Sequence, residues 1–169
     1  YNGFKAPGVE CEIAVELSQN LDARSQTISR EEAEESIAAL YPAIEVVDNR
    51  YQDIMAVGTP TLIADDFCQA AVVLGPKKKD TKGMDLETLI GQTFINDIEV
   101  GDGQGRDVLG HPLNALIWLA NHLALRDRCL YSGEFIFLGS LVQCHWLNPN
   151  DTASIKIEGL GTVTTNFPN

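Results

Sequence analysis

The sequence predicts a β-rich α+β domain, and three observations support this class. Short runs of alternating or β-branched residues recur along the chain, and Gly, Pro, Asn and Asp residues separate them. Only two segments have the spacing of amphipathic helices. The 169 residues fit one domain, and 44% apolar residues are enough for a core. We expect about nine short strands and two main helices, with mostly antiparallel connections at the C-terminal end.

The first strand is predicted from Val9 to Leu17, where apolar and polar residues alternate. Side chains alternate faces along a strand, so the apolar residues share one face and Glu10, Glu12 and Glu16 share the other. Glu10 and Glu12 are then same-face neighbours, about 6–7 Å apart at their Cα atoms. Two carboxylates this close repel each other unless solvent screens them or a cation lies between them.

A helix is predicted to begin at Ser29, because Ser29 and Glu32 form a capping box. Ala33, Ile37 and Leu40 would be its buried stripe, and Pro42 would end it. A strand containing Glu45 should follow at once.

The second helix is predicted to begin at Pro112 and to run to about Arg126, with Trp118 packed in the core. Before it, three glycines between Gly101 and Gly105 predict a loop that can approach a ligand closely. His111 lies just before the helix, where a capping or packing role is more common than a role as general base. The other predicted elements are a helical turn at 85–90 and strands at 59–64, 70–74, 93–100, 135–138, 141–146, 153–157 and 162–167.

The net charge of −12 excludes electrostatic binding to nucleic acid or to anionic membranes. It does not exclude an anionic substrate, since a bound dication reverses the local field. The four cysteines are scattered without a Cys-x-x-Cys pair, which favours reduced residues in a cytoplasmic protein over a zinc site. The longest apolar region, 113–125, is too short and too polar to span a membrane.

Glu45 is a third carboxylate, and it lies inside a β-branched run where Glu is disfavoured unless it faces water or has a function. Three carboxylates that leave positions open for water or substrate suit a hard divalent cation, Mg²⁺ or Mn²⁺. The alternative is a solvated acidic strand face without an ion.

Three blocks of sequence carry a resemblance to a known family. The chain resembles the catalytic region of the fumarylacetoacetate hydrolase superfamily, and within it the branch of 2-keto-4-pentenoate hydratases and 4-oxalocrotonate decarboxylases. The three blocks are Val9-Glu10-Cys11-Glu12-Ile13-Ala14, Ile44-Glu45-Val46-Val47-Asp48-Asn49-Arg50, and Val108-Leu109-Gly110-His111-Pro112-Leu113-Asn114-Ala115 through Trp118-Leu119-Ala120. Two C-terminal segments also fit, Leu138-Gly139-Ser140-Leu141 and Gly159-Leu160-Gly161-Thr162-Val163.

The resemblance implies a β-roll of mixed sheets, a homo-oligomer, and Mg²⁺ or Mn²⁺ held by Glu10, Glu12 and Glu45. It further implies a small 2-oxo acid substrate that chelates the ion through its carboxylate and keto oxygen. The predicted activity is a metal-dependent hydratase, a lyase acting on a 2-hydroxy-dienoate or 2-oxo-enoate in aromatic catabolism. A 2-oxo-enedioate decarboxylase of the 4-oxalocrotonate type is an alternative, and a non-catalytic metal-binding homologue or fragment is another.

Four further residues are predicted to contact the substrate or support the metal ligands. Asp48 and Arg50 would form a pair that steadies Glu45 or receives the substrate, and a plain surface ion pair is the alternative. Arg106 would meet a second carboxylate of the substrate, and a solvent-exposed arginine is the alternative. Ser140 would donate to the first carboxylate, and a serine that only forms a turn is the alternative.

Two departures from the family pattern motivate the non-catalytic alternative. Arg106-Asp107 stands where relatives usually have small residues. Relatives also have a longer N-terminal region, which contains a lysine and an acid thought to move protons. We therefore expect residues 1–169 to be a single catalytic-type domain that lacks this region, so the general acid and base are not assigned.

Overall fold

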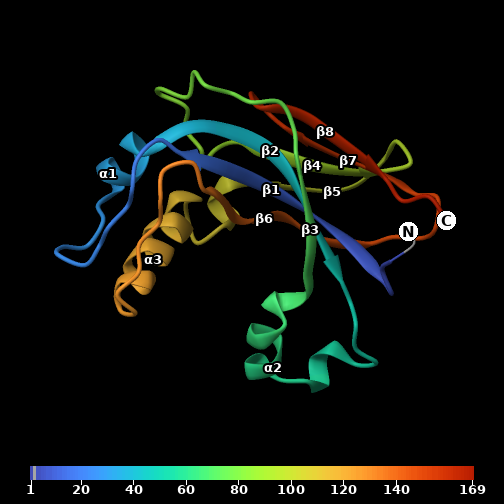
Figure 1. The fold of residues 1–169 in the computed structure, drawn as a ribbon. Coiled ribbons are helices and arrows are strands. Elements are labelled where there is room, and N and C mark those ends of the chain that lie inside the picture. Colours follow the sequence, from blue (N-terminus) through green and yellow to red (C-terminus); the bar gives the residue numbers. More distant parts are fainter. Residues whose placement is uncertain (2) are drawn as a thin grey trace.

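The computed structural model describes residue 1 and residues 3–169, and it confirms the α+β class. Two four-stranded sheets pack together, with strand orders β3-β2-β1-β6 and β5-β4-β7-β8 (Figure 1). All strand pairs among the described residues are antiparallel, whereas the resemblance implied mixed sheets.

The strands are β1 (Pro7–Leu17), β2 (Ile37–Asp48), β3 (Gln69–Leu74), β4 (Ile90–Ile95), β5 (Ile98–Gln104), β6 (Phe135–Trp146), β7 (Thr152–Ile157) and β8 (Gly161–Asn166). The helices are α1 (Arg30–Glu35), α2 (Thr59–Ala64) and α3 (Leu113–Ala124), with short 3₁₀ turns at Ile54–Ala56, Asp66–Cys68 and Gly105–Asp107.

The core lies between the two sheets and under α3. The apolar face of β1 predicted from the alternation is fully buried there, with Val9 and Ile13 among its residues. Leu116 of α3 and Ile155 of β7 belong to the same cluster. This packing fixes the register of β1 and leaves its glutamates on the opposite face. No helix in the described part of the chain is long and apolar enough to cross a membrane.

The first helix of the structure, α1, is much shorter than the helix predicted from the sequence. Ser29 does cap α1 through the predicted box with Glu32, but the chain turns into β2 at Ile37. Ile37 and Leu40 therefore lie in a strand, and Pro42 is inside it, paired in register with Ile13 of β1. Pairing with the neighbouring strands overrides local helix propensity here, because it buries a long apolar run.

Two predictions for the middle of the chain are wrong. Residues 59–64 form α2 rather than a strand, and Pro60 in its first turn was the overlooked signal. Residues 93–100 form the β4–β5 hairpin rather than one strand. Asn96 and Asp97 make its turn with positive φ angles of 52° and 66°, as two-residue hairpin loops require.

The glycines at 101–105 serve strand packing rather than a ligand loop. A Cβ added to Gly103 would lie 1.9 Å from the carbonyl oxygen of Leu141, and one on Gly105 would lie 1.8 Å from that of Leu86. The close approach predicted for Gly103 and Gly105 is therefore to the chain's own backbone, and Gly101 approaches the side chains of Val142 and His145. Trp118 of α3 is also not in the core, since it is 61% exposed and stacks on His122.

Candidate metal centre

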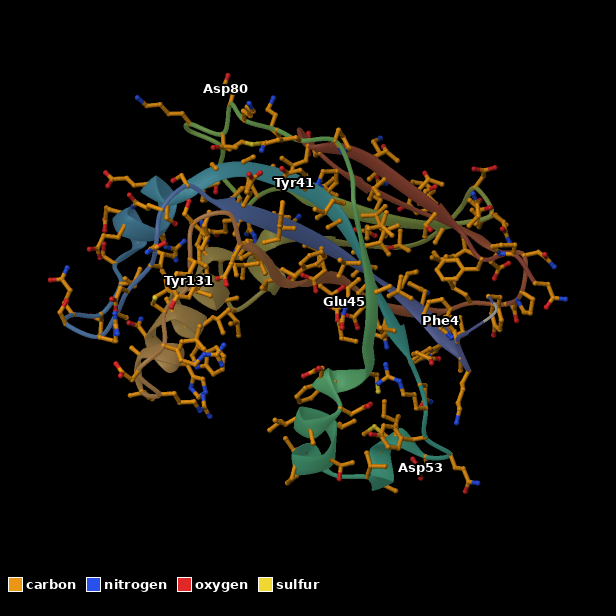
Figure 2. The ribbon with its side chains drawn as sticks, viewed as in Figure 1. Phe4, Tyr41, Glu45, Asp53, Asp80 and Tyr131 are labelled. Carbon is orange, nitrogen blue, oxygen red and sulfur yellow. The ribbon has the colours of Figure 1, made fainter. Side chains whose placement is uncertain are left out.

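The register of β1 and β2 brings the three predicted carboxylates together. Glu10 lies directly opposite Glu45, and Glu12 is two residues along the same face of β1. One oxygen from each side chain lies within 4.8 Å of the other two. Figure 2 shows Glu45 on the side of the sheet from which α2 projects. The alternation within β1 brings Glu10 and Glu12 to one face, but only the pairing of β1 with β2 adds Glu45 to them.

Burial and mutual repulsion make it unfavourable for all three carboxylates to be ionised at once. Burial, together with the neighbouring carboxylates of Glu45 and Glu10, raises the pKa of Glu12 to about 8, against the backbone hydrogen bond from Gly139, which lowers it. Burial also raises the pKa of Glu10 and of Glu45. Glu12 is only 3% exposed. A proton or a cation must therefore compensate these charges at neutral pH.

Gly139 holds Glu12 in place, a role that sequence reasoning missed. Its backbone N–H donates to Oε2 of Glu12 at 2.7 Å. Gly139 has a φ of +116°, and an added Cβ would lie 3.0 Å from the side chain of Val108. The sequence marked Gly139-Ser140 as a break between strands, whereas β6 is continuous there and only its register with β1 shifts. This irregularity turns an N–H toward the carboxylate.

The donor set fits a hard divalent cation. Three carboxylates converge, and none of the ion pairs among the described residues involves any of them. Oxygen-only ligands with positions left for water or substrate match the preference of Mg²⁺, Mn²⁺ or Ca²⁺.

Asp48 and Arg50 do not form the predicted pair. Oδ1 of Asp48 accepts from the backbone N–H groups of Lys5 and Ala6. The guanidinium of Arg50 instead binds Oδ1 of Asp65 at 2.8 Å and donates to the carbonyl oxygen of Gln69 at 2.8 Å. Each side chain thus has structural partners of its own, and the pairing prediction was wrong.

The structure also places Ser140 and Arg106. The hydroxyl of Ser140, beside Glu12 in the β1–β6 register, donates to the carbonyl oxygen of Val142 at 2.7 Å. Arg106 is exposed in the 3₁₀ turn after β5, and its backbone N–H donates to the carbonyl oxygen of Glu87. None of the described hydrogen bonds or ion pairs links its side chain to the glutamates. Substrate contact by these two residues stays a prediction.

An open pocket of about 510 Å³ adjoins the cluster at Glu45. Its other lining residues come from α2, the Asp66–Cys68 turn, β3 and β6. Phe67 and Phe137 are the aromatic residues among them, and no pattern in the sequence singles out either. The cluster therefore has space for a small organic ligand beside it.

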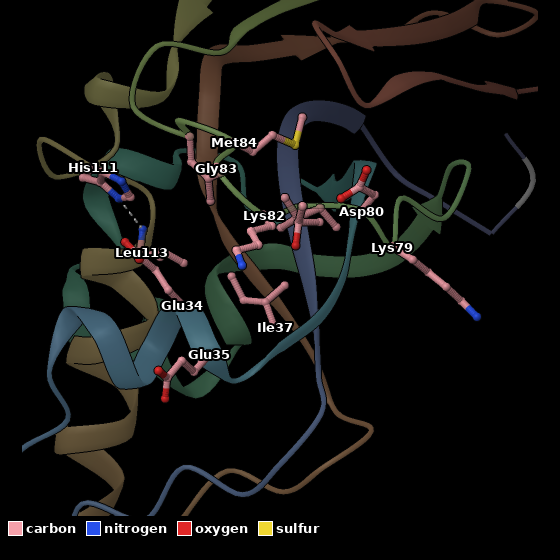
Figure 3. A pocket seen from close by; sticks show the side chains of 13 residues that line it. Glu34, Glu35, Ile37, Lys79, Asp80, Lys82, Gly83, Met84, His111 and Leu113 are labelled. Atoms are coloured by element: carbon pink, nitrogen blue, oxygen red, sulfur yellow. Dashed lines mark hydrogen bonds between the residues drawn. The ribbon is translucent and has the colours of Figure 1, made fainter.

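A second recess of about 590 Å³ lies between α1, the 79–84 loop and the start of α3 (Figure 3). It shares no residue with the glutamate cluster. His111 lines it, and its Nδ1 accepts from the backbone N–H of Leu113 at 3.1 Å. Burial lowers the pKa of His111, with Arg30 adding to the effect. His111 thus supports the start of α3, as the sequence favoured.

Comparisons with known proteins find a matching family model and several similar relatives. The family model described as fumarylacetoacetate (FAA) hydrolase C-terminal matches residues 2–167. A 2-keto-4-pentenoate hydratase from Paraburkholderia xenovorans (strain LB400) is 34% identical over 164 residues. A 4-oxalocrotonate decarboxylase from Pseudomonas putida is 31% identical over 162 residues.

Among solved structures, the 4-oxalocrotonate decarboxylase from Pseudomonas putida G7, complexed with magnesium and adipate, superposes with a TM-score of 0.87 at 29% identity. Each of these matches covers 95% of this chain, but only 59% of the hydratase and 60% of the decarboxylase sequence and of the solved chain. The chain thus spans about three fifths of the length of the relatives it matches.

Proposed function

The chain belongs to the fumarylacetoacetate hydrolase C-terminal family, as its sequence predicted, and from this premise we propose that it is a divalent-metal-dependent hydratase. Its substrate would be a small 2-hydroxy-dienoate or 2-oxo-enoate of aromatic catabolism, as the name of its hydratase relative suggests. The observation that carries the proposal is the convergence of Glu10, Glu12 and Glu45 on one face of the sheet.

The residues of the chain have defined roles in this proposal. Glu10, Glu12 and Glu45 hold the ion, Mg²⁺ or Mn²⁺, and the N–H of Gly139 fixes the orientation of Glu12. When bound, the ion supplies Lewis acidity toward the keto oxygen of a chelating 2-oxo acid. Because Glu12 is buried among apolar strands, the carboxylates act in a setting where charge interactions are strong.

A decarboxylase acting on 2-oxo-enedioates is the second candidate. It is favoured by the superposition on the 4-oxalocrotonate decarboxylase, whose complex contains magnesium and the dicarboxylate adipate. The two activities would share the metal chemistry, but a hydratase adds water across a C=C bond, whereas a decarboxylase breaks a C–C bond and releases CO₂. A non-catalytic metal-binding homologue is the third candidate, and it predicts metal binding without turnover.

The proposal includes a homo-oligomer in the cytoplasm without nucleic-acid or membrane partners. The net charge of −12 supports the last point, since it repels polyanions.

Turnover tests the proposal directly. A 2-hydroxy-dienoate and a 2-oxo-enedioate are incubated with the chain and Mg²⁺ or Mn²⁺, and loss of the conjugated chromophore is followed together with CO₂ release. A hydratase consumes the dienoate without CO₂, and both EDTA and Glu45→Gln stop the reaction. CO₂ release from the enedioate alone would favour the decarboxylase. Metal binding with no turnover of either substrate would favour the non-catalytic homologue.

A further inference from the structure

From the pocket beside Glu45 we infer that this chain selects 2-oxo acids with an uncharged, apolar tail over those with a second carboxylate. The inference rests on the proposed function, because it assumes that the head of the substrate chelates an ion at the three glutamates. It adds a prediction about the tail of the substrate. The tail distinguishes the two candidates, because the substrate of the decarboxylase has a second carboxylate and that of the hydratase does not.

The lining of the pocket is apolar where a tail would lie. Val72 of β3 is the cross-strand neighbour of Glu45, so it lies directly beside the cluster. Ile63, Phe67 and Phe137 complete the apolar lining. The hydrocarbon tail of a substrate whose head is bound at the glutamates would extend from Glu45 along this surface. There it would lose contact with water and gain contacts with aliphatic and aromatic side chains.

The charged groups that line the pocket are all acidic. They are Glu45 and Asp66, and the remaining polar residue is Gln69. No Lys or Arg is among the described residues that line it. A second carboxylate on the substrate would therefore meet negative charge without a cationic partner among these lining residues, which disfavours binding here. Arg106, on the 3₁₀ turn after β5, does not line this pocket.

The nearby cation, Arg50, is already engaged. Its two terminal nitrogens bind Asp65 and the carbonyl oxygens of Cys68 and Gln69. These contacts clamp the turn that carries Phe67. To reach a substrate carboxylate, Arg50 would have to leave an ion pair of 2.8 Å and its backbone acceptors.

The backbone of the Asp66–Cys68 turn is strained, and this conformation places the side chain of Phe67 at the pocket. Asp66, Phe67 and Cys68 have consecutive positive φ angles of 49°, 51° and 68°, and none is glycine. Such conformations are unfavourable for residues with a Cβ and persist where the surroundings enforce them. The buried side chain of Cys68 and the Arg50 clamp enforce this one, and they leave the ring of Phe67 57% exposed at the pocket. Phe67 is therefore a specificity-determining residue for the tail, and Arg50 is a positioning residue.

Binding measurements on the Mg²⁺-loaded chain test the inference without relying on turnover. Oxalate serves as the head-group reference, and 2-oxobutanoate, 2-oxopentanoate, 2-oxohexanoate and 2-oxoglutarate are compared by calorimetric competition. We expect affinity to rise about two- to fourfold for each added methylene. We expect 2-oxopentanoate to bind about tenfold more tightly than 2-oxoglutarate, which has the same carbon count but a charged end.

Three variants locate the effect. Phe67→Ala should remove most of the affinity that 2-oxohexanoate gains over 2-oxobutanoate, which share the same head group. Ile63→Lys should reduce the ratio of affinities for 2-oxopentanoate and 2-oxoglutarate, because it supplies a cation for the second carboxylate. Met55→Ala is the matched control, since Met55 is 88% exposed on the neighbouring 3₁₀ turn but does not line the pocket. It should keep the wild-type ratios.

The outcomes separate the two proposals. If oxalate fails to bind the chain in the presence of Mg²⁺, the proposed function fails and this inference fails with it. If oxalate binds but tail length has no effect, or 2-oxoglutarate binds as tightly as 2-oxopentanoate, the tail preference is overturned while the proposed function stands.

Discussion

Replacing Glu12 by Gln should make the metal-free protein more stable at alkaline pH and abolish its response to metal. Glu12 is buried, and its pKa is raised from 4.5 to about 8. Gln has nearly the same shape, and its amide oxygen can still accept from the N–H of Gly139. The substitution therefore removes the charge with little change in packing.

The direction of the pH effect follows from proton linkage. Between pH 4.5 and about 8 the folded chain binds more protons at Glu12 than the unfolded chain does. The free energy of unfolding of the metal-free protein therefore falls as pH rises through this window. The contribution is fully present below pH 4.5 and is lost above about pH 8, with an upper limit of about 5 kcal/mol at about 1.4 kcal/mol per pH unit. We expect Glu12→Gln to exceed the wild type by about 2–5 kcal/mol at pH 8.5, and to match it near pH 5.

Urea denaturation at both pH values, in EDTA and in Mn²⁺, is the assay. Metal at 100 times its dissociation constant should stabilise the wild type by about 2.7 kcal/mol and the variant by almost nothing. Glu158→Gln, on an exposed residue outside the cluster, is the control and should behave as the wild type. Equal stability of Glu12→Gln and wild type in EDTA at pH 8.5, with an unchanged Mn²⁺ response, would refute the reasoning.

Three further substitutions separate the roles of neighbouring residues. Glu45→Gln should weaken Mn²⁺ binding at least about tenfold by calorimetry, because it removes one of three ligands; an unchanged affinity would place the ion elsewhere. Gly139→Ala should destabilise the fold by about 1–3 kcal/mol in urea and also weaken Mn²⁺ binding, since φ is +116° and Val108 is close; wild-type values for both would contradict the role of its N–H. Arg50→Lys should cost about 1–3 kcal/mol, because lysine cannot reproduce the forked contacts, and should leave Mn²⁺ affinity unchanged. A loss of Mn²⁺ binding in Arg50→Lys would indicate that Arg50 supports the ligands after all.

The sequence predicted the parts of the fold where a pattern has one physical reading. Strict alternation identified β1 and its buried face, and the capping box identified the start of α1. The same alternation placed Glu10 and Glu12 on one face. The carboxylate of Glu45 inside a β-branched run placed it in the same candidate site, and the resemblance implied the same three residues. Its position directly opposite Glu10 was not predicted, because cross-strand register depends on the whole sheet.

The failures arose where tertiary contacts decide between local alternatives. Residues after Ile37 have both helical spacing and strand-forming residues, and pairing with β1 settled the choice. Gly103 was assigned to a loop because its close contact, the carbonyl of Leu141, is distant in sequence. The roles of Gly139 and Phe67 depend on positive φ angles that sequence pattern does not reveal.

The most direct test of the central claim is a calorimetric titration of the chain with Mg²⁺ and Mn²⁺, with and without oxalate. If the three glutamates hold an ion that a 2-oxo acid chelates, metal binds the wild type, oxalate binds only after metal is present, and Glu12→Gln loses both events. If neither ion binds, or oxalate binds equally without metal, Glu10, Glu12 and Glu45 are an acidic strand face and the claim is contradicted.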